Sequence, residues 1–306
     1  MITALSHSFL HMLLPLALAP LLLSVINRTK AIVAGRNGQV LLQPYYDLAK
    51  LLRKGAVYSH TTTWVFRAGP VVGLAAVIVA TTLVPFGGAS AAVSFAGDLI
   101  LFAYLLGLLR FVTVIAALDT GSSFEGMGAS REVTFSALAE PALLLALAAV
   151  ARQTGSLSLT TMYAGVTGAT WTHAAPVFAL VAGALMVVFL TENARMPVDD
   201  PTTHLELTMI HEVMVLDHSG PDLAFIVYGS ALKLWVLGVL LVGLVVPIHS
   251  GNAWADSIVG FAGLLGLAVV TGIIESSMAR WRLTRVPQLL VGACVLSTLA
   301  LVLMLR

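Results

Sequence analysis

The sequence has few charged residues and a single cysteine, and both shortages narrow the possible classes of protein. Only 10% of the 306 residues are charged, against roughly a quarter in soluble domains, and 58% are hydrophobic. Cys294 stands alone in an apolar run, which excludes a self-contained iron–sulfur cluster, a cysteine-rich zinc site and an intrachain disulfide. The net charge of +1 gives no reason to expect a nucleic acid partner. This composition indicates an integral membrane protein whose main partner is the lipid bilayer.

Eight apolar stretches approach or reach the length of about 20 residues that a helix needs to cross a bilayer. They lie near Ser8 to Ile26, Pro70 to Phe86, Asp98 to Leu118, Val133 to Arg152, Ala174 to Thr191, Leu223 to Pro247, Ser257 to Ile274 and Val286 to Leu305. No internal repeat or low-complexity tract is evident. We therefore expect an all-α integral membrane protein with about eight transmembrane helices in a single polytopic domain over residues 1–306. The first helix lacks the flanks of a cleaved signal peptide and is expected to be retained.

The basic residues are distributed unequally between the two ends of these helices. Twelve of them fall in the connections at residues 27–69, 119–132, 192–222 and 275–285, whereas the opposite side holds only Arg152 and Arg306. The positive-inside rule then places the four basic loops in the cytoplasm and both termini outside. We expect a multi-pass protein of a bacterial or archaeal inner membrane.

The first of these loops contains a candidate surface helix. Apolar residues recur there at helical spacing, with polar and charged residues elsewhere on the turn, as in a helix lying in the membrane interface. The apolar positions are Leu41, Leu42, Tyr45, Leu48, Ala49 and Leu52, and the polar ones are Gln43, Asp47, Lys50, Arg53 and Lys54. By composition, this helix could equally contact lipid headgroups or dock a protein partner.

Four ionisable residues are expected at membrane depth: Arg110, Glu140, Lys233 and Glu275. Each costs about 2.5 to 3.5 kcal/mol there, so such residues persist where they line a polar path or pair with one another. Glu140 precedes Pro141, which loosens the helix and favours a hydrated proton station. The alternative is a structural ion pair of Glu140 with Arg110 or Lys233. Arg110 and Glu275 could also reach the interface from a helix end.

The densest ionisable cluster runs from Glu192 to Glu212, beside a transmembrane helix. It contains the carboxylates Glu192, Asp199, Asp200, Glu206 and Glu212, with Arg195, His204 and His211. Apolar residues alternate with these charges, so we expect a partly buried segment with perturbed carboxylates. A helix starting at Pro201 would place Asp199 and Asp200 near its positive end.

Three histidines, His204, His211 and His218, recur every seven residues in this region. They would share one helical face, but side chains two turns apart are about 10 Å apart along the axis, too far for one metal ion. The spacing therefore favours proton transfer or ordinary hydrogen bonding over a metal site.

Four blocks of the sequence together resemble one known family. They are Gly35 to Lys50, Gly128 to Arg131 followed by Glu140, Glu192 to Asp199, and Arg280 to Leu290. Their order and their common side of the membrane resemble the membrane subunit that respiratory complex I shares with group 4 nickel–iron hydrogenases, the formate hydrogenlyase subunit 4 and hydrogenase-4 component C type.

Departures from complex I separate the two branches of this family. Thr202 and His204 stand where complex I carries further glutamates, the stretch from Glu206 to Gly220 is about one turn longer, and no Trp-Lys pair follows Leu290. The sequence is more similar to the hydrogenase branch. A quinone-chamber subunit of a complex I-like oxidoreductase is the alternative. A stand-alone ion transporter is a distant third, because no inverted repeat with broken helices is found.

The resemblance implies a non-catalytic subunit that couples a hydrogenase to proton movement. It implies no cofactor, metal ion or catalytic residue in this chain; the nickel–iron centre and iron–sulfur clusters are expected in hydrogenase large and small subunits, beside antiporter-like membrane subunits. The implied proton path comprises Glu140, Glu192, Asp199, Asp200, Glu206, Glu212, Lys233 and Glu275. The implied docking residues for the soluble arm are Arg28, Lys30, Arg36, Gln43, Asp47, Arg53, Arg131, Arg195, Arg280, Arg282 and Arg285.

Overall fold

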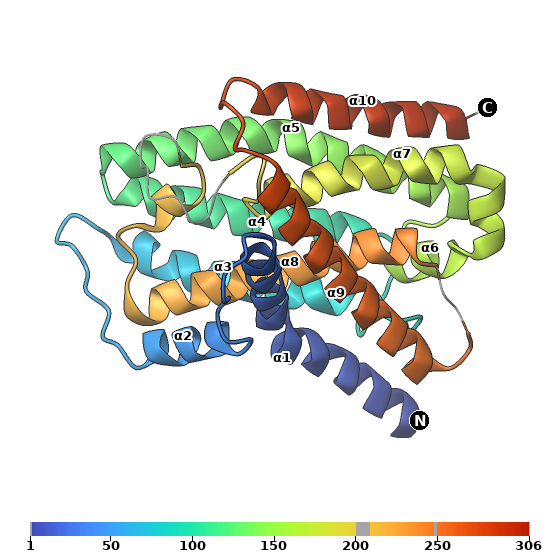
Figure 1. Ribbon diagram of the computed structural model, residues 1–306, viewed down its shortest axis with the longest axis horizontal. Coiled ribbons are helices and arrows are strands. Elements are labelled where there is room, and N and C mark those ends of the chain that lie inside the picture. Colours follow the sequence, from blue (N-terminus) through green and yellow to red (C-terminus); the bar gives the residue numbers. More distant parts are fainter. Residues whose placement is uncertain (1, 200–208, 248–249, 306) are drawn as a thin grey trace.

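The computed structural model describes residues 2–199, 209–247 and 250–305, which form ten α-helices and one 3-10 helix (Figure 1). Eight helices are long and apolar enough to cross a membrane, which confirms the predicted fold class. They are α1 (Ile2–Val33), α3 (Trp64–Leu83), α4 (Asp98–Asp119), α5 (Ser123–Thr154), α7 (Gly168–Glu192), α8 (Gly220–Val245), α9 (Ala253–Ser277) and α10 (Val286–Met304). The short elements are α2 (Gln43–Leu52), α6 (Leu159–Gly165) and η1 (Glu212–Val215).

Helix α8 forms the centre of the bundle. From Ala231 to Leu241 every residue is buried, and α8 packs against α1, α3, α7 and α9. Helix α10 packs on α5 and α7, while α9 crosses the bundle obliquely (Figure 1). Helix α1 begins and α10 ends at the same end of the molecule, called here the terminal end; α2 lies at the opposite end, called the α2 end (Figure 1). An even number of membrane-spanning helices returns the chain to the end at which it began, so both termini lie at the terminal end.

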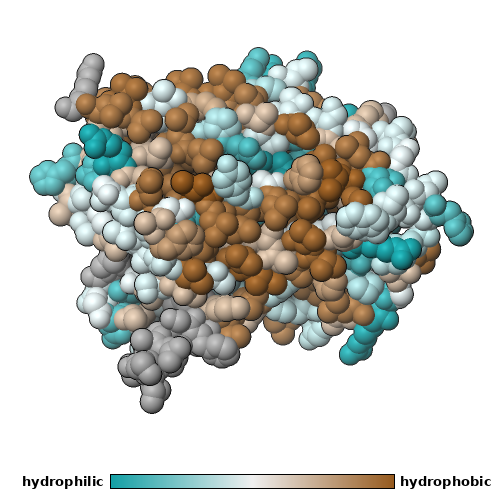
Figure 2. All heavy atoms as spheres, turned by 180° about the vertical axis from the view of Figure 1, so that it is seen from behind, coloured by the Kyte–Doolittle hydropathy of each residue, from teal (hydrophilic) through white to brown (hydrophobic). Residues whose placement is uncertain are grey.

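The outer surface matches a membrane-spanning bundle. Hydrophobic side chains gather across the middle of the face seen in Figure 2, and hydrophilic ones lie at its two ends. The protein is therefore a multi-pass membrane protein. The predicted surface helix is confirmed as α2, in which no residue is buried.

Several loops are shorter than the sequence predicted. Helix α1 continues to Val33, α3 begins at Trp64, and α5 begins at Ser123, so most of the loop expected at 119–132 is helical. Hydropathy marks where the apolar surface ends, whereas backbone hydrogen bonds and caps decide where a helix ends. The Asp119 carboxylate shows this, because it accepts hydrogen bonds from the backbone N–H of Thr63 at 2.7 Å and of Phe66 at 3.2 Å and so caps α3.

Two tyrosines fix a proline-containing bend in α1. Pro20 has no N–H, so the Leu16 carbonyl four residues earlier loses its helical donor. The Tyr228 hydroxyl of α8 donates to that carbonyl at 2.7 Å. The Tyr45 hydroxyl of α2 donates to the neighbouring Ala17 carbonyl at 2.5 Å. The bend thereby positions the surface helix α2.

The segment after α7 is not one continuous helix in its described part. His211 precedes the four-residue helix η1, and His218 follows it in a turn. The expected common helical face of these two histidines is therefore wrong, and His204 lies outside the described residues. The expected partial burial is confirmed, since Val198, Met209 and Met214 are buried.

Candidate functional site

The candidate site is built around Arg110, nine residues before the end of α4 and about 13 Å from it along the axis. Its side chain is 11% exposed and faces three carboxylates. It pairs with Glu140 of α5, with Glu192 of α7 at 2.5 Å (Nη2 to Oε1) and with Glu132 of α5 at 3.5 Å (Nε to Oε1). The planar guanidinium suits this task because it presents several donors in fixed directions.

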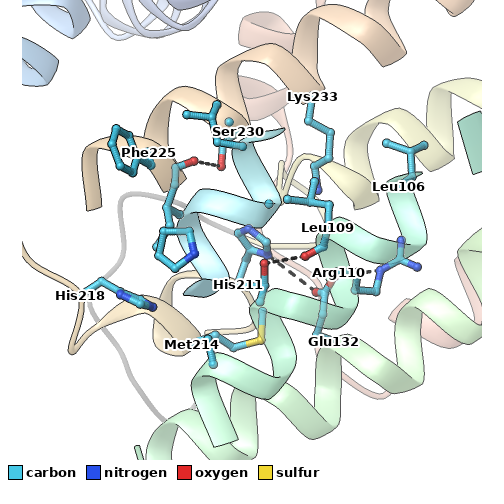
Figure 3. A pocket seen from close by; sticks show the side chains of 18 of the residues that line it. Leu106, Leu109, Arg110, Glu132, His211, Met214, His218, Phe225, Ser230 and Lys233 are labelled. Atoms are coloured by element: carbon cyan, nitrogen blue, oxygen red, sulfur yellow. Dashed lines mark hydrogen bonds and ion pairs between the residues drawn. The ribbon is translucent and has the colours of Figure 1, made fainter. Parts of the chain in front are cut away.

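Two further groups extend this arrangement. The Nζ atom of Lys233 in α8 lies 3.8 Å from Oε2 of Glu192, and Nδ1 of His211 lies 3.9 Å from Oε2 of Glu132. Figure 3 shows Arg110 and His211 both directed toward Glu132, with Lys233 reaching down from α8. We call the set Arg110, Glu132, Glu140, Glu192, His211 and Lys233 the ion-pair cluster. Charges this deep are tolerated only when they are paired, so the cluster fixes α4, α5, α7 and α8 relative to one another.

Two cavities meet at the ion-pair cluster. The main cavity, with about 670 Å³ of atom-free space, lies among α3, α4, α5, α8 and the segment around η1. Its walls are apolar toward Leu74 and Phe225 and charged toward the cluster. The loop cavity, with about 310 Å³, lies between α5 and the segment after α7 and reaches Asp199. Glu132, Glu192 and His211 line both cavities.

Glu140 marks the lateral edge of the ion-pair cluster. Its side chain is 48% exposed on the outside of the bundle, whereas that of Glu192 is 6% exposed. The ion pair with Arg110 that was one alternative for Glu140 is present, and the carboxylate also reaches the lateral surface of α5 beside Pro141. Its role as a proton station stays a prediction. A carboxylate at this depth is costly in lipid, so this surface suits a neighbouring protein.

Asp199 anchors the segment that follows α7. Its buried carboxylate accepts hydrogen bonds from the backbone N–H of Ile210 and of His211, both at 3.1 Å. Nη2 of Arg280 lies 2.9 Å from the same carboxylate. Nη1 of Arg131 donates to the Met209 carbonyl at 2.8 Å. The two arginines were expected to face a docking partner; in the structure both are partly exposed and hold this segment.

Glu275 belongs to a separate buried group. Its side chain is fully buried between Nζ of Lys30, at 2.9 Å, and Nη1 of Arg195, at 3.4 Å. The family resemblance implied a place on the proton path for Glu275 and on the docking surface for Arg195. In the structure Arg195 is buried and offers no docking surface, because both cations neutralise Glu275 between α1, α9 and the start of the loop.

The other expected docking residues lie at the α2 end. The Gln43 amide donates to Asp47 within α2 at 2.9 Å. The exposed ones are Arg28, Arg36, Asp47, Arg53, Arg282 and Arg285. Of the remaining predicted path residues, Glu212 is half-buried at the start of η1, while Asp200 and Glu206 lie outside the described residues.

Sequence reasoning missed Glu132, the carboxylate at the centre of the site. It fell within a predicted loop, although Glu132 and Glu140 are two turns apart and face the same neighbour, Arg110. The available signal was the need of Arg110 and Lys233 for partners at membrane depth. Among the described residues, no group of three His, Cys, Asp or Glu side chains is arranged to hold a metal ion.

His218 lies apart from the ion-pair cluster, at the edge of the main cavity (Figure 3). Its ring stacks on Phe66 with 3.9 Å between centroids and 7° between planes. Burial disfavours the charged imidazolium and lowers the pKa of His218 to about 4. At neutral pH this histidine is an uncharged wall of the cavity.

Comparison with known proteins relates the whole chain to membrane subunits of respiratory complexes. A family model described as NADH dehydrogenase matches residues 7–306. Formate hydrogenlyase subunit 4 of Escherichia coli K12 is 30% identical over 279 residues, which cover 89% of this chain and 90% of that protein. Hydrogenase-4 component C of the same organism is 29% identical over 273 residues, covering 87% and 85%. A chain of the archaeal membrane-bound sulfane sulfur reductase shares the fold, with a TM-score of 0.83, 18% identity and 99% coverage of both chains.

Proposed function

The chain belongs to the NADH dehydrogenase family, and from this we propose that it is the membrane-anchor and proton-coupling subunit of a nickel–iron hydrogenase complex of the formate hydrogenlyase type. The relatives that cover nine-tenths of its length support the hydrogenase branch. The observation that carries the coupling role is the ion-pair cluster, which joins the loop cavity to the exposed carboxylate of Glu140.

Protons would travel laterally through this cluster. One guanidinium faces three carboxylates, so protonating one of them frees Arg110 to hold the others more strongly. A change of charge at the loop cavity is thereby passed to Glu140, 48% of whose side chain is open to a neighbouring antiporter-like subunit. Asp199 stands at the loop end of this route, with Asp200 and Glu206 expected near it. Lys233 holds Glu192 from the α8 side.

The α2 end would dock the soluble arm that carries the nickel–iron centre and iron–sulfur clusters. Its exposed arginines supply positive charge on α1, just after α1, after α2 and in the last loop. They are Arg28, Arg36, Arg53, Arg282 and Arg285. With one cysteine, the chain lacks the thiolates that such centres need, so the metals belong to partner subunits and this chain by itself evolves no hydrogen. The excess of Lys and Arg at this end supports the proposal that it faces the cytoplasm of a bacterial or archaeal cell, with both termini outside.

Metal analysis and mass spectrometry of the complex captured through a tag on this chain, in mild detergent, test the assignment. We expect nickel, iron and a hydrogenase large subunit. Flavin and quinone without nickel would move the chain to the complex I-like alternative. A chain captured without any metalloprotein would point to a stand-alone transporter.

The coupling role is tested on the same complex in sealed vesicles. We expect Glu192→Gln to reduce the protons translocated per hydrogen molecule. Asp98→Asn is the matched control, because Asp98 is a buried carboxylate at the terminal end that accepts hydrogen bonds from Ser158 and Leu159. Equal coupling in both variants would remove the cluster from the mechanism.

A further inference from the structure

We infer that the imidazole of His211 transfers protons between the loop cavity and the main cavity, with Glu132 as its partner. This rests on the proposed function, in which protons move through the ion-pair cluster. Sequence analysis left His211 open between proton transfer and ordinary hydrogen bonding, and the structure places it where the two cavities adjoin.

The position of His211 between the two cavities supports this inference. His211 and the carboxylates Glu132 and Glu192 line both cavities, while Asp199 lines only the loop cavity and Lys233 only the main cavity. Of these five, only His211 carries a group that is neutral in one protonation state and a donor from both ring nitrogens in the other. Histidine is also the side chain that most often transfers protons in proteins.

The charged residues around His211 also support proton transfer through it. Glu132 of α5 faces His211 directly, with Nδ1 and Oε2 3.9 Å apart. Behind Glu132 lies Arg110 of α4, whose Nε is 3.5 Å from the other carboxylate oxygen. Glu192 of α7 and Lys233 of α8 complete the lining toward the main cavity. An arriving proton on His211 is therefore attracted by Glu132, and Arg110 limits how tightly Glu132 retains it.

The backbone at His211 is held in place by Asp199, which keeps the ring beside both cavities. The Asp199 carboxylate accepts the backbone N–H of His211 at 3.1 Å and is itself held by Arg280 at 2.9 Å. Asp199 thus anchors the His211 backbone, while the His211 ring lies between the two cavities. The 3.9 Å between Nδ1 of His211 and Oε2 of Glu132 is short enough for a small rotation of the ring, or one water molecule, to connect the two groups.

The step moves one proton and no electrons. Neutral His211 accepts a proton on one ring nitrogen from the loop cavity, and the imidazolium releases a proton from the other nitrogen to the Glu132 carboxylate. The ring then returns to its first tautomer by rotation or by proton exchange with water. His218 is unsuited to this step, since its ring is stacked on Phe66 and lies apart from Glu132 (Figure 3).

Proton translocation by the captured complex in sealed vesicles tests the inference, with hydrogen evolution in the presence of an uncoupler measured alongside. We expect His211→Ala to slow proton translocation by about tenfold or more, given the ~10²-fold that proton-transfer groups often contribute. Added imidazole should restore part of the rate in His211→Ala and none in His211→Phe, which fills the space. His173→Gln is the matched control, because His173 is exposed near the start of α7 at the terminal end.

Glu132→Gln should lower the rate similarly, and the double variant His211→Ala/Glu132→Gln should lose no more than either single variant, because the two residues act in one step. Unchanged translocation in His211→Ala, or a rate that imidazole leaves unaltered, would overturn the inference. If the unmodified complex forms no proton gradient, the proposed function itself fails. Should His211→Ala not assemble, His211→Asn keeps a polar side chain and carries the same test.

Discussion

At the scale of single residues, the protein concentrates its charge on a few shared partners. Arg110 forms ion pairs with three carboxylates, and Glu275 forms ion pairs with two cations. Removing one member of such a group leaves buried charge less fully neutralised, which costs far more free energy than an exposed ion pair contributes.

Arg110→Met should strongly destabilise the protein. Three carboxylates lose their common cation, and breaking a buried pair typically costs about 3 to 5 kcal/mol. Thermal unfolding in detergent measures the effect. Arg67→Met is the control, since the exposed Arg67 lies 4.2 Å above the Tyr58 ring and contributes about 0.5 to 1 kcal/mol. Equal melting temperatures for both variants would contradict the shared role of Arg110.

The stability of the fold should decrease on acidification between pH 6.5 and about 4. The pKa of His218 falls from 6.5 to about 4 on folding, so in this window the unfolded state binds the proton and the folded state does not. The contribution is complete above pH 6.5 and is lost as the pH falls through the window. Melting temperatures at pH 7.5 and pH 5 should differ less in His218→Phe, which keeps the stacking on Phe66 and cannot titrate. An unchanged difference would assign the acid sensitivity to another group.

At the scale of helices, prolines and buried ions set where each element lies. Most spans could be predicted from the sequence because about 20 apolar residues have few alternatives to a transmembrane helix. The surface helix α2 also followed from its helical periodicity. The start of α5 at Ser123 did not, because a polar helical turn and a polar loop have the same hydropathy.

Tyr45→Phe should loosen α2 without unfolding the bundle. It removes the hydrogen bond to the Ala17 carbonyl, worth about 0.5 to 1.5 kcal/mol, and that bond ties α2 to the bend in α1. Hydrogen–deuterium exchange of residues 43–52 should accelerate. Tyr46→Phe provides the control, since Tyr46 is 59% exposed on the same helix. Equal exchange in the two variants would show that α2 is held by other contacts.

Glu275→Gln should weaken the association of α1 with α9. The change leaves Lys30 and Arg195 without their shared carboxylate between these helices. We expect a lower melting temperature and faster proteolysis near residues 193–199, where Arg195 anchors the chain. Asp47→Asn, at an exposed position of α2, should change neither. Retained stability in Glu275→Gln would mean that the two cations find other partners.

At the scale of the whole molecule, the sequence showed which charged residues lie within the bundle, but not which of them form ion pairs with one another. Glu140, Glu192 and Lys233 were predicted as one path, and the structure brings Glu140 and Glu192 to Arg110 and Lys233 to Glu192. Glu275 was assigned to the same path because sequence cannot show which helices are neighbours. Pairing depends on how α1 and α9 cross, and that crossing is decided by packing over the entire bundle.

The 48% exposure of the Glu140 side chain has a consequence for biogenesis. A newly inserted copy would expose this carboxylate to hydrocarbon until a neighbouring subunit covers it. The unassembled chain is therefore expected to be less stable in the membrane than the assembled one. We expect the chain to be short-lived when it is synthesised without its membrane partners, and Glu140→Leu to lengthen that lifetime in a pulse-chase measurement. Equal lifetimes would show that the exposed acid is tolerated. In the proposed mechanism Glu140 passes charge to the next subunit, and its exposure would then also signal whether that subunit is bound.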